Sequence, residues 1–232
     1  MIAAGIVAGG SGSRMGGELP KQFLELNGKP VVVYTAEKFL SCSAIDIVII
    51  GINPVWKDHM ERLAEEYFPE NDRLLIVSGG SDRNETILNI ISAAEEKFAP
   101  RDEDIILTHD AVRPFVTEKM IADSINVVKN CEICTAAIPA TDTIISTENG
   151  ETANGFPDRG KMRLVQTPQT FKINTFKKVY AALDEPERAA ATDVCRLYHS
   201  KGYQVRIIDG DVSNIKLTYP QDYELAKLIV NR

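Results

Sequence analysis

Two basic side chains beside a glycine-rich stretch are the residues of this chain best suited to do chemistry. The run Ala8-Gly9-Gly10-Ser11-Gly12-Ser13 leads to Arg14, and Lys21 follows after Pro20. Glycines let successive backbone N–H groups converge on phosphate oxygens, and the two cations add positive charge beside them. Because an apolar segment precedes the run, we predict a nucleotide phosphate site where a strand ends. The alternative is a tight glycine turn with two solvated basic residues.

Two better-known phosphate loops do not match this stretch. The P-loop pattern GxxxxGK[ST] is absent, because Gly-Lys is never followed by Ser or Thr. The dinucleotide pattern GxGxxG fits only loosely, as Gly10-Ser11-Gly12 with Gly16 one position late. That pattern also has no use for an arginine inside the loop. The loop therefore favours a free nucleoside triphosphate over a dinucleotide.

A second cluster reads Thr108-His109-Asp110-Ala111-Val112-Arg113 and follows another apolar run. A carboxylate just past a strand suits Mg²⁺, which takes one or two carboxylates together with phosphate oxygens and water. We therefore predict Asp110 as a metal ligand and Arg113 as a phosphate contact; the alternative for Asp110 is a helix cap or a turn. We expect His109 to be structural, because phosphoryl transfer depends mainly on positioning and charge.

Two further clusters complete the candidate site. Backbone groups after the glycine pair Gly79-Gly80 could recognise a base edge, with Thr86 adding a hydrogen bond, although Ser81 or Asp82 could simply cap the helix that follows. The last cluster lies downstream and comprises Arg159, Thr192-Asp193 and Asn214-Ile215-Lys216. With Arg14, Lys21 and Arg113 these residues would supply the local positive charge that a triphosphate and a second phosphate need.

Composition limits the function classes. The 232 residues carry a formal net charge of −7 at pH 7, which argues against a general nucleic-acid or membrane-surface binder. No secretion leader opens the sequence and no apolar run is long enough to span a bilayer, so we expect a cytoplasmic protein. Cys131 and Cys134 form a CxxC without a second pair, and we expect structural thiols there rather than zinc or redox chemistry.

Apolar runs alternate with helical periodicity along the chain, which predicts an α/β fold: a Rossmann-like, mainly parallel sheet flanked by helices. The expected strands are 2–8, 45–50, 74–77, 105–107, 133–138 and 204–208. The expected helices are 31–40, 56–67, 84–97, 118–129, 175–183, 192–201 and 220–229. The alternation breaks at about 140–172, where we expect a protruding arm of short β ribbon. One domain, 1–232, accounts for the whole chain.

The motifs together resemble the sugar- and alditol-phosphate nucleotidyltransferases, in particular their cytidylyltransferase branch. The matching pieces are AGGSGSR with PKQFL, GGSDRNETI, HDAVRPF, QTPQTF and NIKLTYPQDYELA, and they extend over nearly the whole chain. Their wording is more similar to the enzymes that make CDP-ribitol for teichoic acids than to the methylerythritol-phosphate enzymes of isoprenoid biosynthesis. The latter more typically have HDAARP and an acid directly before Asn-Ile-Lys. Here Ser213 holds that position, and Asp211 is the nearest acid.

The resemblance implies a nucleotidyltransferase fold with CTP and a polyol phosphate as substrates and Mg²⁺ as cofactor. It implies that Val7, Ala8, Gly9 and Gly10 hold the CTP phosphates and ribose, and that Gly80, Ser81, Asp82, Arg83, Asn84, Glu85 and Thr86 recognise cytosine. Arg14 and Lys21 would stabilise charge on the α-phosphate. Arg113, Arg159, Thr192 and Lys216 would hold the acceptor phosphate, with Arg159 and Lys216 also counted as catalytic.

The metal would be bound by Asp110, with Asp211 as a weak second candidate. The family's arm exchanges between subunits, so the resemblance also implies a homodimer in which Arg159 completes the neighbour's site. Three alternatives stay open from the sequence: methylerythritol phosphate as the acceptor, a nucleotide-sensing module without enzymatic activity, and a dinucleotide-dependent reductase.

Overall fold

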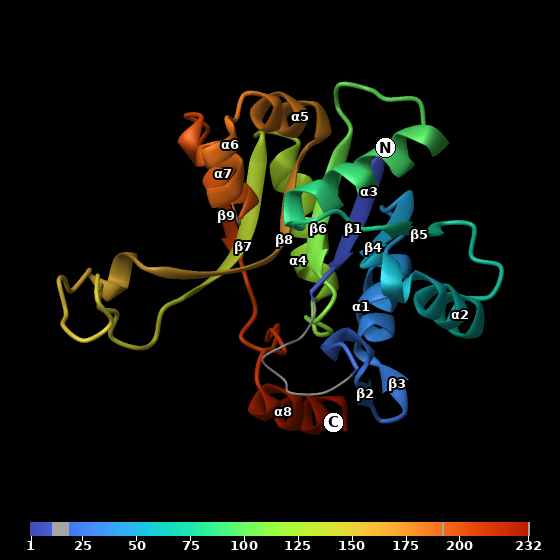
Figure 1. Ribbon diagram of the computed structural model, residues 1–232, viewed down its shortest axis with the longest axis horizontal. Helices are drawn as coiled ribbons and strands as arrows, with labels where there is room; N and C mark the ends of the chain where they lie inside the picture. Colours follow the sequence, from blue (N-terminus) through green and yellow to red (C-terminus); the bar gives the residue numbers. More distant parts are fainter. Residues whose placement is uncertain (11–18, 192, 232) are drawn as a thin grey trace.

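A single seven-stranded sheet organises the computed structural model, which describes residues 1–10, 19–191 and 193–231 (Figure 1). The strand order is β5-β4-β1-β6-β8-β7-β9. All strands are parallel except β8, which runs antiparallel between β6 and β7. The strands are β1 (Ile2–Ala8), β4 (Ile47–Ile52), β5 (Leu74–Ser78), β6 (Ile105–Asp110), β7 (Ile133–Pro139), β8 (Arg163–Lys172) and β9 (Arg206–Asp209), and a small hairpin pairs β2 (Glu25–Leu26) with β3 (Lys29–Pro30). The mainly parallel α/β fold is confirmed.

Helices cover both faces of the sheet, because the buried strands are apolar on both sides. In β4, Val48, Ile50 and Ile52 pack toward one face, while Ile47 and Ile49 pack toward the other. The first face is covered by α1 (Val31–Leu40), α2 (Lys57–Tyr67) and α4 (Glu118–Val128). The second is covered by α3 (Arg83–Lys97), α5 (Ile173–Ala181) and α7 (Val194–Ser200).

The last helix, α8 (Pro220–Val230), belongs to neither layer. It packs beside the β2–β3 hairpin in a small third cluster, in which Leu217 and Ala226 meet Leu26, Val31 and Val112. Figure 1 shows it at the end of the molecule toward which β1 runs. The chain thus returns from β9 to the carboxyl ends of the central strands, where ligands bind in folds of this kind.

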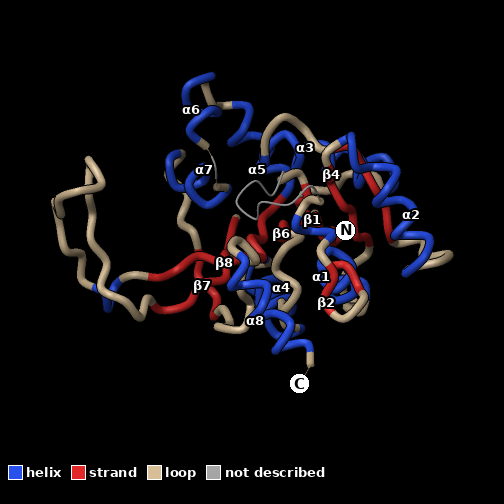
Figure 2. The backbone as a smooth tube through the Cα atoms, turned by 60° about the horizontal axis from the view of Figure 1, so that its bottom comes forward, coloured by secondary structure: helices blue, strands red, loops and turns tan. Residues whose placement is uncertain are grey.

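The predicted arm extends too far along the chain. Residues 163–172 form the ten-residue strand β8 inside the main sheet, so the arm comprises only residues 140–162. It projects from the body between β7 and β8 and carries one isolated bridge, Ser146 to Gly155 (Figures 1 and 2). The strand escapes a periodicity argument because its centre, Gln166-Thr167-Pro168-Gln169-Thr170, is polar although buried.

Of the other predicted elements, the strand at 2–8 and the helix at 31–40 have the expected bounds, and the rest occur with shifted ends. The strand expected at 45–50 is found at 47–52, and the one expected at 204–208 is found at 206–209. The short helix α6 (Glu185–Ala190) was not predicted, although Asp184 and Glu187 form a capping box at its start. Cys131 is half-buried, Cys134 is buried, and neither is in a disulfide. No helix in the described ranges is long and apolar enough to cross a membrane.

Candidate active site

A cavity of about 330 Å³ opens at the carboxyl ends of β1 and β6. Because Val7 pairs directly with Asp110, the glycine stretch after β1 and the acidic residue ending β6 share one edge of the sheet. The third wall comes from the start of α3, and Lys216 enters from the segment before α8. The cavity is lined by Val7, Ala8, Gly9, Gly10, Lys21, Gln22, Gly80, Ser81, Asp82, Arg83, Thr86, Asp110, Ala111, Val112 and Lys216.

Gln22 holds the start of the glycine stretch in place. Its side chain is 2% exposed, and its Nε2 donates to the backbone oxygens of Ala8 at 2.9 Å and Gly10 at 3.3 Å. With those carbonyls turned toward Gln22, the backbone of residues 8–10 has a defined course at the cavity wall. Gln22 was not among the predicted site residues, although it lies in the PKQ motif and directly follows Lys21.

The turn from β5 into α3 forms a rigid edge of the same cavity. Asp82 caps the helix by accepting from the Glu85 N–H at 2.9 Å, so the capping alternative holds for Asp82, which also lines the cavity. Thr86 Oγ1 accepts from the Gly80 N–H at 3.0 Å and donates to the Asp82 carbonyl at 2.8 Å. A Cβ at Gly80 would lie 2.2 Å from Glu85 Cβ, so this close turn requires glycine.

Two members of this predicted base-reading segment do not line the cavity. Asn84 is buried beneath it, where its Nδ2 donates to the Ala191 carbonyl at 2.5 Å. Glu85 faces outward and accepts from the N–H and hydroxyl of Ser81, bonds that lower the pKa of the Glu85 carboxyl. Asn84 and Glu85 therefore hold the segment in place through hydrogen bonds and do not line the cavity.

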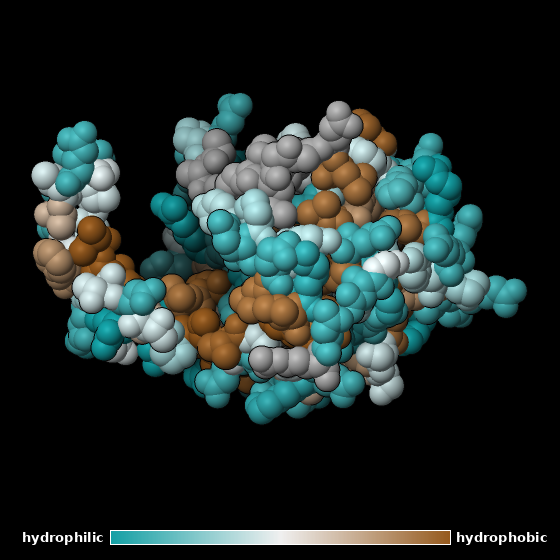
Figure 3. Space-filling model, turned by 90° about the horizontal axis from the view of Figure 1, so that it is seen from below, coloured by the Kyte–Doolittle hydropathy of each residue, from teal (hydrophilic) through white to brown (hydrophobic). Residues whose placement is uncertain are grey.

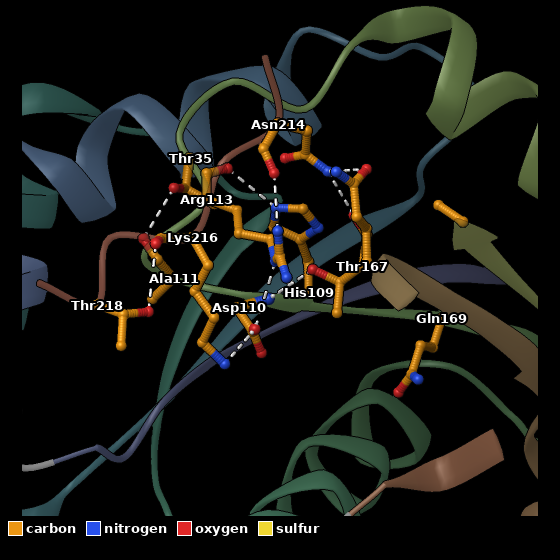
Figure 4. Close-up of polar contacts among 12 residues, drawn as sticks. Thr35, His109, Asp110, Ala111, Arg113, Thr167, Gln169, Asn214, Lys216 and Thr218 are labelled. Carbon is orange, nitrogen blue, oxygen red and sulfur yellow. Dashed lines mark hydrogen bonds and ion pairs between the residues drawn. The ribbon is translucent and has the colours of Figure 1, made fainter. Parts of the chain in front are cut away.

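Asp110 lies at the centre of a group of three cations. Its carboxylate is 2.7 Å from Arg83 Nη1. It is also 2.8 Å from Lys216 Nζ and 3.6 Å from Arg113 Nε (Figure 4). Burial by itself raises the pKa of Asp110, but the charges of Arg83, Lys216 and Arg113 outweigh it and hold that pKa well below its usual range. The group places a permanent anion and three cations at one point of the site.

His109 is part of the support beneath this group. It is fully buried against Phe39, and its Nε2 lies 3.0 Å from the Arg113 carbonyl, which can only accept. Nε2 therefore carries the proton of the neutral ring. Burial lowers the pKa of His109 to about 4, in keeping with a structural role.

A second, smaller cavity of about 200 Å³ adjoins the first. Arg83, Asp110 and Lys216 line both, so the cationic group forms their common boundary. The remaining lining residues are Arg113, Val165, Gln166, Thr167, Gln169 and Asp193. Four of these lie on β8, which the sequence analysis assigned to the arm, and none of the four was a predicted site residue.

β8 and the segment after β9 are bonded together beside this cavity. Asn214 Nδ2 donates to the Thr167 carbonyl at 2.9 Å, and the Asn214 carbonyl accepts from Arg113 Nη1 at 2.7 Å (Figure 4). Thr167 Oγ1 in turn accepts from the Asp110 N–H at 3.2 Å. Asn214 thus fixes the backbone that carries Lys216 against both β6 and β8.

Four further predicted residues remain, and two of them, Arg159 and Asp211, line neither cavity. Arg14 and Thr192 lie outside the described residues. Arg159 lies in the exposed arm, where its guanidinium donates to the Thr141 carbonyl. Asp211 lines neither cavity, and its carboxylate accepts from the N–H and hydroxyl of Ser213. As for metal binding, the described residues contain no group of three or more His, Cys, Asp or Glu side chains able to hold an ion.

Comparison with known proteins assigns this arrangement to a family. Residues 2–232 match the family described as IspD, 2-C-methyl-D-erythritol 4-phosphate cytidylyltransferase. The chain belongs to this family. It is accordingly a member of the nucleotidyltransferase enzymes, as the motifs and the fold indicate.

The sequence relatives and the similar solved structures bear names from two branches of this IspD family. The chain is 40% identical over 234 residues to a ribitol-5-phosphate cytidylyltransferase of Streptococcus pneumoniae serotype 2, with 100% of both chains covered. A 4-diphosphocytidyl-2C-methyl-D-erythritol synthase from Anaerococcus prevotii has a similar structure, with a TM-score of 0.81, 25% identity and coverage of 100% and 96%. A second synthase of that name gives a TM-score of 0.80 at 26% identity, with coverage of 99% and 98%.

Proposed function

We propose that this IspD-family enzyme joins CTP and D-ribitol 5-phosphate to give CDP-ribitol and pyrophosphate. The observation that carries the proposal is the pair of adjoining cavities that share Arg83, Asp110 and Lys216. The larger cavity has the glycine stretch and Lys21 for a triphosphate, and the smaller one has room and charge for a small phosphate ester. Ribitol is preferred to methylerythritol because the relative at 40% identity is named for ribitol 5-phosphate.

The reaction needs no covalent enzyme intermediate. An oxygen of the acceptor phosphate attacks the α-phosphorus of CTP, the bond from that phosphorus to the bridging oxygen breaks, and its electron pair leaves with pyrophosphate. A phosphate monoester is already anionic at neutral pH, so no base is required. The obstacle is the approach of two anions, and Arg83, Arg113 and Lys216 lower it from the acceptor side, while Arg14 and Lys21 act on the α-phosphate.

Asp110 fits a magnesium site of the kind that is completed by phosphate oxygens. It is ionised, it borders both cavities, and one carboxylate suffices when the nucleotide supplies the other ligands. A bound Mg²⁺ would supply charge neutralisation on the triphosphate. Asp211 is engaged with Ser213, so we propose Asp110 as the protein ligand.

The arm suggests how a second subunit contributes. It exposes two large apolar side chains, Ile145 at 52% and Phe156 at 72%, and Figure 3 shows hydrophobic residues on the arm and where it joins the body. A single arm has no core of its own in which to bury them. We propose a homodimer in which the arm of one subunit packs on its partner and brings Arg159 to the partner's acceptor cavity.

Three alternatives remain as outcomes of experiment. The solved structures at 25% and 26% identity favour methylerythritol phosphate as the acceptor, whereas a nucleotide sensor or a dinucleotide-dependent reductase would leave the second cavity without a use.

We expect kcat/KM to be at least about tenfold higher for ribitol 5-phosphate than for 2-C-methyl-D-erythritol 4-phosphate. The reverse preference would contradict the assignment of ribitol 5-phosphate as the acceptor. If neither acceptor leads to release of pyrophosphate, the nucleotide sensor is favoured. Binding of NAD(P)H that CTP fails to displace would favour the reductase. We also propose a cytoplasmic location for this reaction and a role of its product in teichoic acid synthesis.

A further inference from the structure

The smaller cavity contains a second set of polar side chains away from Asp110. Gln169, on β8, and Asp193, the residue that caps α7, both line it. Gln169 Nε2 lies 2.6 Å from Asp193 Oδ2 and 3.2 Å from Cys195 Sγ. Figure 4 shows Gln169 apart from the ion-paired group around Asp110 and Lys216. The cavity therefore has a cationic region and a separate amide–carboxylate region.

The Asp193 carboxylate fixes the orientation of the Gln169 amide. An ionised carboxylate has no proton to donate, so the amide nitrogen, and not the oxygen, must face Asp193. Asp193 is itself held, because its Oδ1 accepts from the Arg196 N–H at the start of α7. The amide cannot turn over without losing its bond to Asp193, and its Oε1 faces away from that carboxylate.

This orientation leaves an acceptor without a donor. Gln169 is 1% exposed, and its Oε1 has no hydrogen-bond partner in the part of the chain that the structure describes. A buried carbonyl oxygen in this state is unfavourable until a ligand supplies a donor. A phosphate dianion has no proton to give, whereas a hydroxyl group has one. Gln169 therefore suits the polyol part of an acceptor and not its phosphate.

We propose that Gln169 recognises a hydroxyl group of the acceptor and that Asp193 positions its amide to do so. This inference rests on the proposed function. The acceptor phosphate lies against Arg83, Arg113 and Lys216, and the polyol chain extends toward Gln169. A methyl group or a bare methylene opposite Oε1 leaves the carbonyl unsatisfied, so the pair selects for a hydroxyl at that carbon.

The test compares ribitol 5-phosphate with its monodeoxy analogues. In the wild-type protein, removal of one particular hydroxyl should lower kcat/KM by at least about tenfold. Gln169→Met keeps the length of the side chain but removes the carbonyl. It should lower kcat/KM for ribitol 5-phosphate by a similar factor, change the value for that analogue little, and leave the KM for CTP within about twofold.

A second variant tests the positioning role of Asp193. Asp193→Asn keeps a good helix cap, but the new amide can donate to Gln169 Oε1 and so lets the Gln169 amide turn over. Its discrimination between ribitol 5-phosphate and the same analogue should shrink as well. The Asp193→Asn variant keeps Gln169, so it still tests the inference if the Gln169→Met variant fails to fold. Thr170→Val, at the next buried position of β8, is the control and should retain wild-type discrimination.

The outcomes separate the inference from the function on which it rests. If the wild-type protein does not use ribitol 5-phosphate at all, the proposed function fails. If it does, and both Gln169→Met and Asp193→Asn retain full discrimination against every deoxy analogue, the inference is wrong while the function stands. Loss of discrimination in Thr170→Val would also overturn it, because any disturbance of β8 would then suffice.

Discussion

The Lys216 ammonium lies 2.8 Å from the Asp110 carboxylate and joins the segment after β9 to the end of β6. The two residues also stand at the boundary of both cavities. An acceptor phosphate that enters there meets a lysine whose charge is already oriented by Asp110. Asp110 thus has two roles, as the residue that anchors the cations and as the proposed metal ligand.

Replacing Lys216 should impair the use of the acceptor more than the binding of CTP. We expect Lys216→Ala to lower kcat/KM for ribitol 5-phosphate by about 10²-fold, the usual loss when one group that stabilises transition-state charge is removed. Steady-state kinetics with either substrate varied gives the comparison. Lys227→Ala, on α8, removes a lysine paired with Glu224 away from the cavities and should behave as wild type. Equal loss in both variants would contradict the assignment.

Gln22 should control the affinity for CTP through the backbone of the glycine stretch. Gln22→Met conserves the shape of the side chain but removes the donor to the Ala8 and Gly10 carbonyls. A net loss of about 1.4 kcal/mol, within the range for such hydrogen bonds, would raise the KM for CTP about tenfold. Gln221→Met, at an exposed position of α8, should leave it unchanged. An unaltered KM in Gln22→Met would show that the stretch does not need this support.

Acid should destabilise the ligand-free protein through His109. Burial lowers the pKa of His109 to about 4 in the folded chain, against the ordinary value of 6.5. Between these two pH values the unfolded chain binds a proton that the folded chain does not, so the free energy of unfolding falls as the pH falls. The expected slope from this one group is about 1.4 kcal/mol per pH unit.

Denaturation by urea at pH 6.5, 5.5 and 4.5 measures that slope. His109→Gln should reduce it by roughly the contribution of one proton, whatever its effect on stability at neutral pH. His199→Gln, at an exposed position near the end of α7, should keep the wild-type slope. A slope that survives in His109→Gln would mean that another group dominates the acid sensitivity.

Complementation between inactive variants tests the contribution of the arm across subunits. Lys21→Ala and Arg159→Ala should each reduce turnover by about 10²-fold. If Arg159 serves the partner's site, a dimer of the two variants contains one site with both side chains intact. Random mixing after joint refolding should then restore up to about a quarter of wild-type activity. A mixture no more active than its components would place Arg159 in its own subunit's site.

The sequence predicts the parts of this fold that follow simple patterns. β1 and α1 occur as expected, because a strand and a helix each leave a local signature in the sequence. Tertiary packing produced the differences. β8 is central yet polar along Gln166–Thr170, because Gln166, Thr167 and Gln169 line the smaller cavity. Gln166 Oε1 also accepts from Asn214 Nδ2. Asn84 lies within the motif but is drawn beneath the cavity by the Ala191 carbonyl.

The motifs predict which residues belong to the candidate site, but they do not predict which of these residues are in contact. Nothing in the sequence places Arg83, a residue of the base-reading segment, 2.7 Å from Asp110. That contact depends on how the start of α3 meets the end of β6 across β1. The two cavities adjoin at this contact between Arg83 and Asp110, which only the structure reveals.

³¹P NMR of the wild-type protein with CTP, Mg²⁺ and ribitol 5-phosphate tests the proposed reaction most directly. We expect the β- and γ-phosphate signals of CTP to be replaced by pyrophosphate, while the diphosphate signals of CDP-ribitol grow in equal amount. Unchanged CTP, or pyrophosphate with CMP in place of the diphosphate, would contradict it.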